Sequence, residues 1–197
     1  MGQTEFIYAL YEEPQAVRNF FAKYINSFLW IYSEMHRQNK PFLDGSSLGF
    51  YHIWTPGKSL WFQDDMGALL SPALYRDFFL ENETTVCAQY DYTLMHLHPS
   101  AFHLLDDILT NENLKAVEIN KDVGGPSVAQ MLSQFRKVRG KKKNLVIWGD
   151  LTEDEIQLIF NELEPEGIFL YILCPDFPRA RYIKNFLECI PERCESG

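Results

Sequence analysis

The first long hydrophobic pattern in the chain spans residues 14–38. Apolar residues recur there three or four positions apart from Val17 to Tyr32, which is the spacing of one helix face. Pro14 fits the first turn of that helix, where its missing N–H group costs nothing. An apolar run before it, at residues 6–11, fits either a strand or a helical turn. We expect the long helix to bury a broad face that includes four aromatic residues: Phe20, Phe21, Tyr24 and Phe28.

Beyond residue 40, short apolar runs alternate with amphipathic stretches. The stretches carry helix start signals, such as Pro72 after the N-cap residue Ser71 and the capping-box spacing of Thr152 and Glu155. The expected strands are residues 48–54, 60–63, 93–97, 114–119, 144–148 and 168–173. The expected helices are residues 72–90, 100–109, 126–139, 152–163 and 180–190. Short apolar strands that alternate with helices predict a parallel sheet with both faces covered.

The alternation continues without a linker or a change of composition, so we expect a single domain over residues 1–197. A doubly wound nucleotide-binding sheet is disfavoured because neither GxGxxG nor GxxxxGK[ST] follows an early strand. A (β/α) TIM barrel is the other common outcome, but such barrels usually need about 250 residues. We therefore predict an α/β, TIM-barrel-like fold of parallel strands that is incomplete, with the first strands missing.

Hydrophobic residues make up 46% of the chain and aromatic residues 15%, which is enough for a packed core and excludes a disordered chain. The 18 basic and 27 acidic residues leave a formal charge of −9, and such a surface repels phosphate backbones. We therefore expect no nucleic-acid partner, and we interpret the short basic run at residues 136–143 as a solvated loop.

No apolar stretch approaches the ~20 residues that a membrane span needs, and no signal peptide opens the chain. The cysteines form no CxxC pair, and without an export signal we expect them to be reduced thiols. These features predict a soluble cytoplasmic protein without a membrane partner.

Polar residues stand where the expected strands end. In parallel α/β folds, the chemistry lies at the carboxyl ends of the strands, which share one rim. If the sheet is parallel, side chains from all of these ends converge. The residues concerned are His52, Asp64, Asp65, His96, His98, Glu118, Asp122, Asp150 and Cys174.

His96 and His98 are the main metal-ligand candidates at this rim. Residues i and i+2 of a strand point to the same face, so both imidazoles can reach one ion. A thiolate from Cys174 would supply a third ligand and leave a fourth position open, as in catalytic zinc sites. Zinc there would lower the pKa of a bound thiol or water and create a nucleophile. The alternative is that one imidazole packs in the core with a backbone hydrogen bond while the other is solvated.

Asp65 and Glu118 are the candidate catalytic carboxylates. Asp65 could orient substrate or accept a proton, or it could precede a helix, where the macrodipole favours negative charge. Glu118 is costly to bury without a partner, so it is functional, solvated or paired, with Lys121 or an arginine as the structural partner. His103 lies within an expected helix and is interpreted as structural.

Several stretches of the chain occur in an order that resembles a known superfamily. They are DDMG at 64–67, LSPALYRDF at 70–78, LMHLH at 94–98, LLDDIL at 104–109, and the strands and turns at 114–122 and 145–149. In this order they resemble the uroporphyrinogen decarboxylase-like superfamily, which includes the decarboxylase itself and zinc-dependent methyltransferases that act with corrinoid proteins. The resemblance covers about residues 14–190.

This resemblance implies a TIM barrel of which the chain supplies the later strands and helices. In the methyltransferase relatives, a His-x-Cys at the end of a strand and a Cys after the last strand hold zinc. His96 matches the first of these ligands and Cys174 the last, while His98 stands in place of the first Cys. Imidazole is also a zinc ligand. The decarboxylase relatives bind their tetrapyrrole through arginines near the start of the barrel, a region that this chain lacks.

The expected function is therefore that of a metal-dependent, methyltransferase-type enzyme. It would bind zinc through His96, His98 and Cys174, take a methyl group from a corrinoid protein, and use Asp65 and Glu118 to orient the substrate or the ligands. An alternative from another class is a non-catalytic truncated barrel that serves as an assembly or binding module, because an incomplete barrel exposes sheet edges and favours homo-oligomers. A further alternative is uroporphyrinogen decarboxylase activity.

Overall fold

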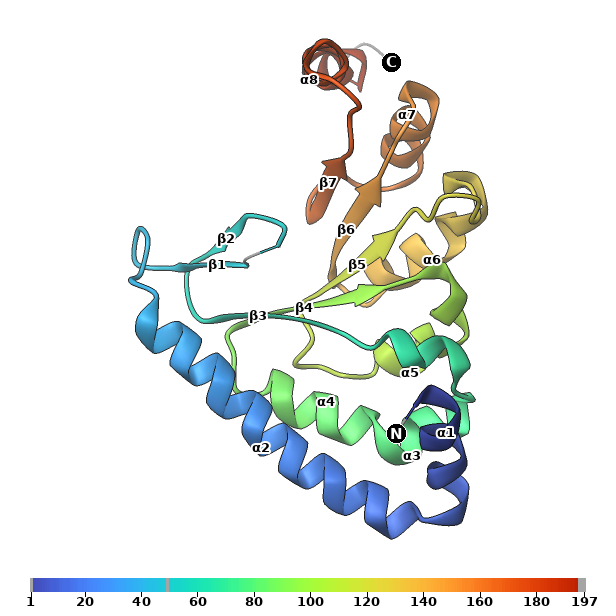
Figure 1. The fold of residues 1–197 in the computed structure, drawn as a ribbon. Coiled ribbons are helices and arrows are strands. Elements are labelled where there is room, and N and C mark those ends of the chain that lie inside the picture. The colour runs from blue at the N-terminus through green and yellow to red at the C-terminus, as the bar shows by residue number, and fades with distance from the viewer. Residues whose placement is uncertain (1, 49, 195–197) are drawn as a thin grey trace.

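The computed structural model describes residues 2–48 and 50–194 and has a mixed α/β fold (Figure 1). Its centre is a five-stranded sheet in which every strand is parallel to its neighbours. These strands lie side by side in chain order, which confirms the predicted α/β class and the parallel sheet. They are β3 (Ser59–Gln63), β4 (Tyr92–Leu97), β5 (Ala116–Asn120), β6 (Asn144–Gly149) and β7 (Ile168–Ile172).

Helical connections join each strand of the sheet to the next. Right-handed crossovers between strands in chain order place the connecting helices on the same face, and Figure 1 shows α5, α6 and α7 together on one side of the sheet. This arrangement is compatible with a partial α/β barrel. The helices after β3 are η1 (Asp65–Leu69, a 3-10 helix), α3 (Pro72–Phe78), α4 (Leu80–Cys87), η2 (Pro99–Leu104, also 3-10), α5 (Leu105–Ile108), α6 (Val128–Gly140), α7 (Glu153–Glu162) and α8 (Phe177–Cys194).

The two faces of the sheet differ in composition. The face under the helices forms the main core, in which alternate strand residues such as Leu97 and Val117 are fully buried. His96 and Glu118 alternate with these core residues and are aligned with each other across β4 and β5, so they belong to the opposite face. That face carries only a small apolar cluster around Leu94. The expectation of two apolar faces is therefore correct only for the helix side.

The strand predicted over residues 48–54 includes residue 49, which lies outside the described residues; residues 48 and 50–54 form part of an antiparallel hairpin instead. Its strands are β1 (Ser46–Leu48) and β2 (Ile53–Thr55), and Figure 1 shows it on the side of the sheet opposite α6. Tyr51 at the turn is buried, whereas His52 is exposed and has a positive φ of 55°. That prediction is wrong because a continuous apolar run does not show where the chain reverses. The reversal carries the buried phenol of Tyr51 onto the second face of the sheet.

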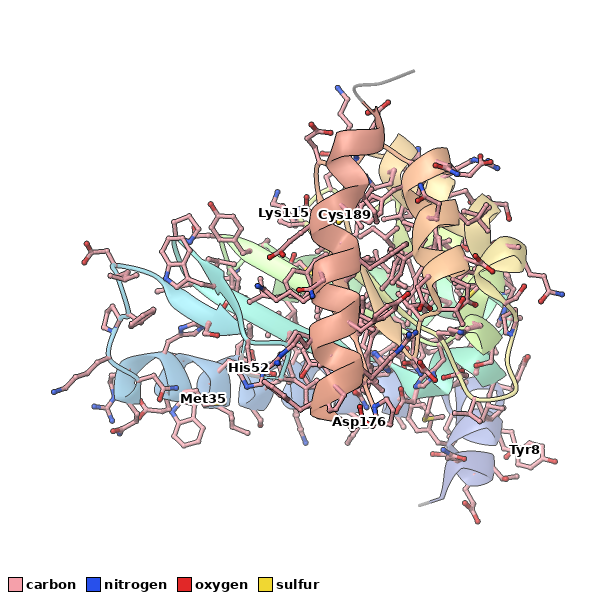
Figure 2. All side chains as sticks on the ribbon, turned by 90° about the horizontal axis from the view of Figure 1, so that it is seen from above. Tyr8, Met35, His52, Lys115, Asp176 and Cys189 are labelled. Carbon is pink, nitrogen blue, oxygen red and sulfur yellow. The ribbon has the colours of Figure 1, made fainter. Side chains whose placement is uncertain are left out.

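Two helices precede the hairpin, α1 (Gln3–Glu12) and α2 (Pro14–Gln38). The first resolves the open alternative for residues 6–11 in favour of a helix. Figure 2 shows Tyr8 on α1 pointing away from the rest of the chain, in agreement with its exposure. Within the described part of the chain, no helix combines the length and the apolarity needed to cross a membrane.

Helix α2 spans the predicted residues, but it buries a narrower face than expected. Val17 is buried, whereas Phe20 and Tyr24 are 54% and 52% exposed. The reason is that α2 lies along the edge of β3 rather than over a sheet face. There the Tyr32 hydroxyl donates to the carbonyl of Trp61 at 2.7 Å, which covers part of the strand edge. The predicted core role is therefore wrong for Phe20 and Tyr24.

The helix predicted over residues 72–90 is interrupted at Phe79, which separates α3 from α4. Its start agrees with the prediction, because Ser71 Oγ accepts a hydrogen bond from Leu74 N at 3.3 Å. The Phe79 ring packs edge-on against Phe21 of α2, with the ring centroids 5.0 Å apart. Phe21 and Phe79 are far apart in the sequence, and their contact occurs at the break in the helix.

The basic run at residues 136–143 is not a solvated loop. Its first part forms the end of α6, where Val138 is fully buried. Lys143 is also buried, and its Nζ donates to the carbonyls of Asn111 at 2.6 Å and Leu114 at 2.7 Å. Burial lowers the pKa of the Lys143 ammonium. The lysine thus binds the turn before β5 to the turn before β6, a role that a count of charges does not reveal.

Candidate metal centre

Strand register brings the candidate ligands together at the carboxyl ends of β3, β4 and β5. His96 on β4 is aligned with Gln63 on β3 and with Glu118 on β5. His98 lies two residues beyond His96 and therefore on the same face. Asp65 follows Gln63 by two residues at the start of η1. As a result, one ligand atom each from Asp65, His96 and His98 lies within 4.8 Å of the other two.

The two imidazole rings face each other through their Nε2 atoms, which are 3.0 Å apart. The other ring nitrogen of each histidine faces a carboxylate: His96 Nδ1 is hydrogen-bonded to Glu118, and His98 Nδ1 lies 2.8 Å from Asp122 Oδ1. An ionised carboxylate can only accept, so a histidine ring that faces one through Nδ1 carries its proton on that atom. Both Nε2 atoms then present lone pairs to the same point. A cation at that point removes their repulsion, and the side chains present therefore fit a metal ion.

The charges around the histidines favour a cation as well. Asp65, Glu118 and Asp122 bring three carboxyl groups to this rim, and Glu118 is fully buried with its Oε1 lacking any hydrogen-bond partner among the described residues. Lys121 does not balance them, because its Nζ lies 2.6 Å from Glu155 Oε2 instead. A buried carboxylate without a positive partner is strongly unfavourable. A bound metal ion would supply that charge.

Polar neighbours hold the carboxylates in place. The Tyr51 hydroxyl donates to Glu118 Oε2 at 2.9 Å, and Asn120 Nδ2 donates to Asp122. Gln63 Nε2 donates to Asp65 Oδ2 at 2.8 Å. Groups that orient the ligands of a metal in this way usually control its affinity. Each of the three carboxyl groups is therefore oriented by a neighbouring donor.

Aromatic side chains form the wall next to His96. The rings of Trp61 and Trp148 lie with their centroids 6.4 Å and 6.1 Å from that of His96. Tyr51 packs against both indoles. Burial, followed by the Glu118 carboxylate, raises the pKa of Tyr51, so its hydroxyl stays protonated and remains a donor. His96 is consequently only 6% exposed, which limits the access of water to this side of the cluster.

Cys174 is not one of the three groups that the structure brings together, so the predicted ligand set is corrected here. Cys174 follows β7, and β5 and β6 separate that strand from β4. With about 4.8 Å between neighbouring strands, this places β7 roughly 14 Å from β4. Asp65 follows β3, which is directly adjacent to β4, and its carboxylate is the third group that lies close to the two histidines.

The structure also gives the contacts of several other candidate residues. Glu118 is paired with His96 and Tyr51 rather than with Lys121 or an arginine. His103, predicted to be structural, has its Nε2 2.8 Å from the carbonyl of Leu70, a contact that agrees with a structural role. Tyr51 was not among the candidate residues. The only sequence signal for it was its position beside His52, within a run that was interpreted as a strand.

Comparison with known proteins yields no relative of this chain. No protein-family model matches it. Searches of curated proteins and of solved structures likewise find no match.

Proposed function

We propose that the protein is a metal-dependent enzyme of the uroporphyrinogen decarboxylase-like type, with zinc held by His96, His98 and Asp65. One observation carries this proposal. The two Nε2 atoms face each other at 3.0 Å while both Nδ1 atoms bind carboxylates. Two imidazoles and one carboxylate are a common ligand set of catalytic zinc, and three protein ligands leave a position open for a substrate.

The residues around the ligands have separate tasks in this proposal. Glu118 and Asp122 fix the tautomer and the orientation of the two rings by accepting from their Nδ1 atoms. Tyr51 holds Glu118 and, together with the indoles, keeps water from the inner side of the cluster. Zinc, when bound, would act as a Lewis acid that lowers the pKa of a coordinated thiol or water. Asp65, predicted as a catalytic carboxylate, acts as a ligand, and Glu118 acts through His96.

The reaction that we propose is methyl transfer from a corrinoid protein to a thiol. Two features support it. The site lies at the carboxyl ends of parallel strands, where barrel enzymes carry their chemistry. The stretches that resemble the superfamily include DDMG and LMHLH, which contain the three proposed ligands. The Asp65 carboxylate replaces sulfur in the ligand set. An oxygen ligand is harder than a thiolate. The activation of a coordinated water, in place of a coordinated thiol, is therefore the reaction that competes with methyl transfer at this site.

Metal content tests the proposed zinc site, and metal spectroscopy tests the proposed activation of a thiol. After purification in zinc-replete buffer, we expect about one zinc per wild-type chain by elemental analysis and a large loss in His96→Ala and in Asp65→Asn. His52→Ala is the matched control, because His52 is exposed and lies outside the ligand group. In the cobalt-substituted protein, an added thiol should produce a sulfur-to-cobalt charge-transfer band. Absence of zinc from the wild type refutes the metal site, and absence of the band refutes thiol activation.

A second candidate function is that of an assembly module, because part of the sheet is open. Within the described residues β7 pairs only with β6, and Phe169 on β7 is 41% exposed. Exposed strand edges promote pairing with another chain, and a homo-oligomer would cover this edge. Sedimentation analysis tests this function. A dimer that Phe169→Lys dissociates supports it, and a monomer at high concentration excludes it.

A further inference from the structure

A cavity of about 590 Å³ lies on the other side of β3 from the hairpin. It is bounded by α1, α2, α4 and the end of β3, which Figure 1 shows at the N-terminal end of the molecule. Its volume is within the range of about 300–1,000 Å³ that is typical of small-molecule sites. The residues of the metal centre, Asp65, His96 and His98, do not line it. The cavity is therefore a separate candidate site.

Seven of the described residues that line this cavity are aromatic. The Phe21 ring packs edge-on against Phe6 and Phe79, with centroid distances of 6.1 Å and 5.0 Å. Phe20 and Tyr24 stack at 6.0 Å and are more than half exposed, so part of their surface is available to a ligand. The remaining aromatic residues of the wall are Phe28 and Phe62. Ring faces carry a negative quadrupole and attract cations.

One end of the cavity is acidic. Glu83 on α4 lines it, and one oxygen of its carboxyl group accepts a hydrogen bond from the Tyr75 hydroxyl at 2.5 Å. Asp64 lines it as well, and its Oδ2 is buried without a hydrogen-bond partner among the described residues. Burial first, and the nearby Asp64 carboxylate in addition, raise the pKa of Glu83 to about 8. No lysine, arginine or histidine is among the described residues that line the cavity.

We propose that this cavity binds a small organic cation, an amine or quaternary ammonium compound with an apolar body. Its aromatic walls and its two partly buried carboxylates attract the same kind of ligand. The apolar body removes ring surface from water, and the positive charge compensates for carboxylates that have no cationic neighbour in the cavity. A neutral apolar molecule would leave Asp64 without a partner, and an anion would be repelled.

An isosteric pair of probes separates charge recognition from apolar packing. Phenyltrimethylammonium and tert-butylbenzene have the same shape and differ in charge, and neither carries a metal ligand. Ligand-observed NMR on the wild-type protein at about pH 8.5, where Glu83 is ionised, should show that the cation binds at least about tenfold more tightly than the neutral probe. Equal binding of the two probes, or no binding of the cation, overturns the proposal.

Two variants locate the binding event. Glu83→Gln preserves the size of the side chain and its ability to accept from Tyr75, and it should weaken cation binding severalfold without changing the neutral probe. Glu81→Gln is the matched control, because Glu81 is an exposed residue of α4 that does not line the cavity. Phe20→Leu removes a half-exposed ring without opening the core and should also weaken the cation selectively. Unchanged cation affinity in both Glu83→Gln and Phe20→Leu overturns this placement.

Discussion

Replacing Glu83 with Gln should stabilise the fold in a manner that depends on pH. The Glu83 carboxyl group packs beside Tyr75 and near Asp64, and burial is the main cause that raises its pKa from 4.5 to about 8. Glutamine has nearly the same volume and can accept the same hydrogen bond from Tyr75. It cannot ionise, so the variant removes the charge and little else.

The raised pKa of Glu83 determines whether a higher pH stabilises or destabilises the wild-type fold. A carboxyl group whose pKa is higher in the folded state than in the unfolded chain contributes to stability while it is protonated. The contribution of Glu83 is therefore complete below about pH 4.5 and is lost as the pH rises to about 8. At about 1.4 kcal/mol for each pKa unit, the upper limit of this loss is about 5 kcal/mol. Because the side chain is partly open to the cavity, we expect about 2–4 kcal/mol.

Urea unfolding at about pH 5 and about pH 8.5 measures the effect. The advantage of Glu83→Gln over the wild type should grow by about 2–4 kcal/mol between these two conditions. Asp64, whose pKa is raised to about 6 by burial and by Asp65, titrates in both proteins, so its contribution largely cancels. Glu81→Gln should show no such growth, because Glu81 is exposed. An advantage of Glu83→Gln that is the same at both pH values refutes the reasoning.

Three further changes test other parts of the structure. Glu118→Gln removes the acceptor charge behind His96 and should weaken zinc binding by about 10–100-fold in a chelator competition assay, whereas an unchanged affinity would contradict the role of Glu118. Lys143→Met leaves the carbonyls of Asn111 and Leu114 without their donor and should lower the free energy of unfolding by about 2 kcal/mol in urea; a neutral effect would show that water replaces the ammonium. The Thr152 Oγ1 atom caps α7 by accepting a hydrogen bond from Glu155 N at 3.3 Å. Thr152→Ala removes this cap and should lower the free energy of unfolding by about 1 kcal/mol in thermal unfolding, and Thr152→Ser is the control that retains the cap.

The elements set by local patterns could be predicted from the sequence. Pro14 and the apolar spacing after it mark the bounds of α2, and the capping box at Thr152 marks the start of α7. These signals work because they depend on residues only a few positions apart, as hydrogen bonds within a helix do. Alternation of strands and helices then indicated the parallel sheet, since parallel neighbours need a crossover connection.

Elements that depend on distant contacts were not predictable in this way. The hairpin around Tyr51 and the break in the helix at Phe79 occur where residues meet partners far away in the chain, such as Glu118 and Phe21. The exposed rings of α2 have the spacing of a core helix, and only the position of α2 beside β3 decides that Phe20 and Tyr24 line a cavity.

The candidate metal centre also has a part that local sequence predicts and a part that only distant contacts determine. The i, i+2 spacing of His96 and His98 was sufficient to place two imidazoles on one face, because side chains alternate along a strand. The third ligand depends on which strand lies beside β4, and no residue near the histidines carries that information. The strand order puts Asp65 next to them and Cys174 three strands away, so it is the tertiary structure that favours the carboxylate over the thiolate as the third candidate ligand.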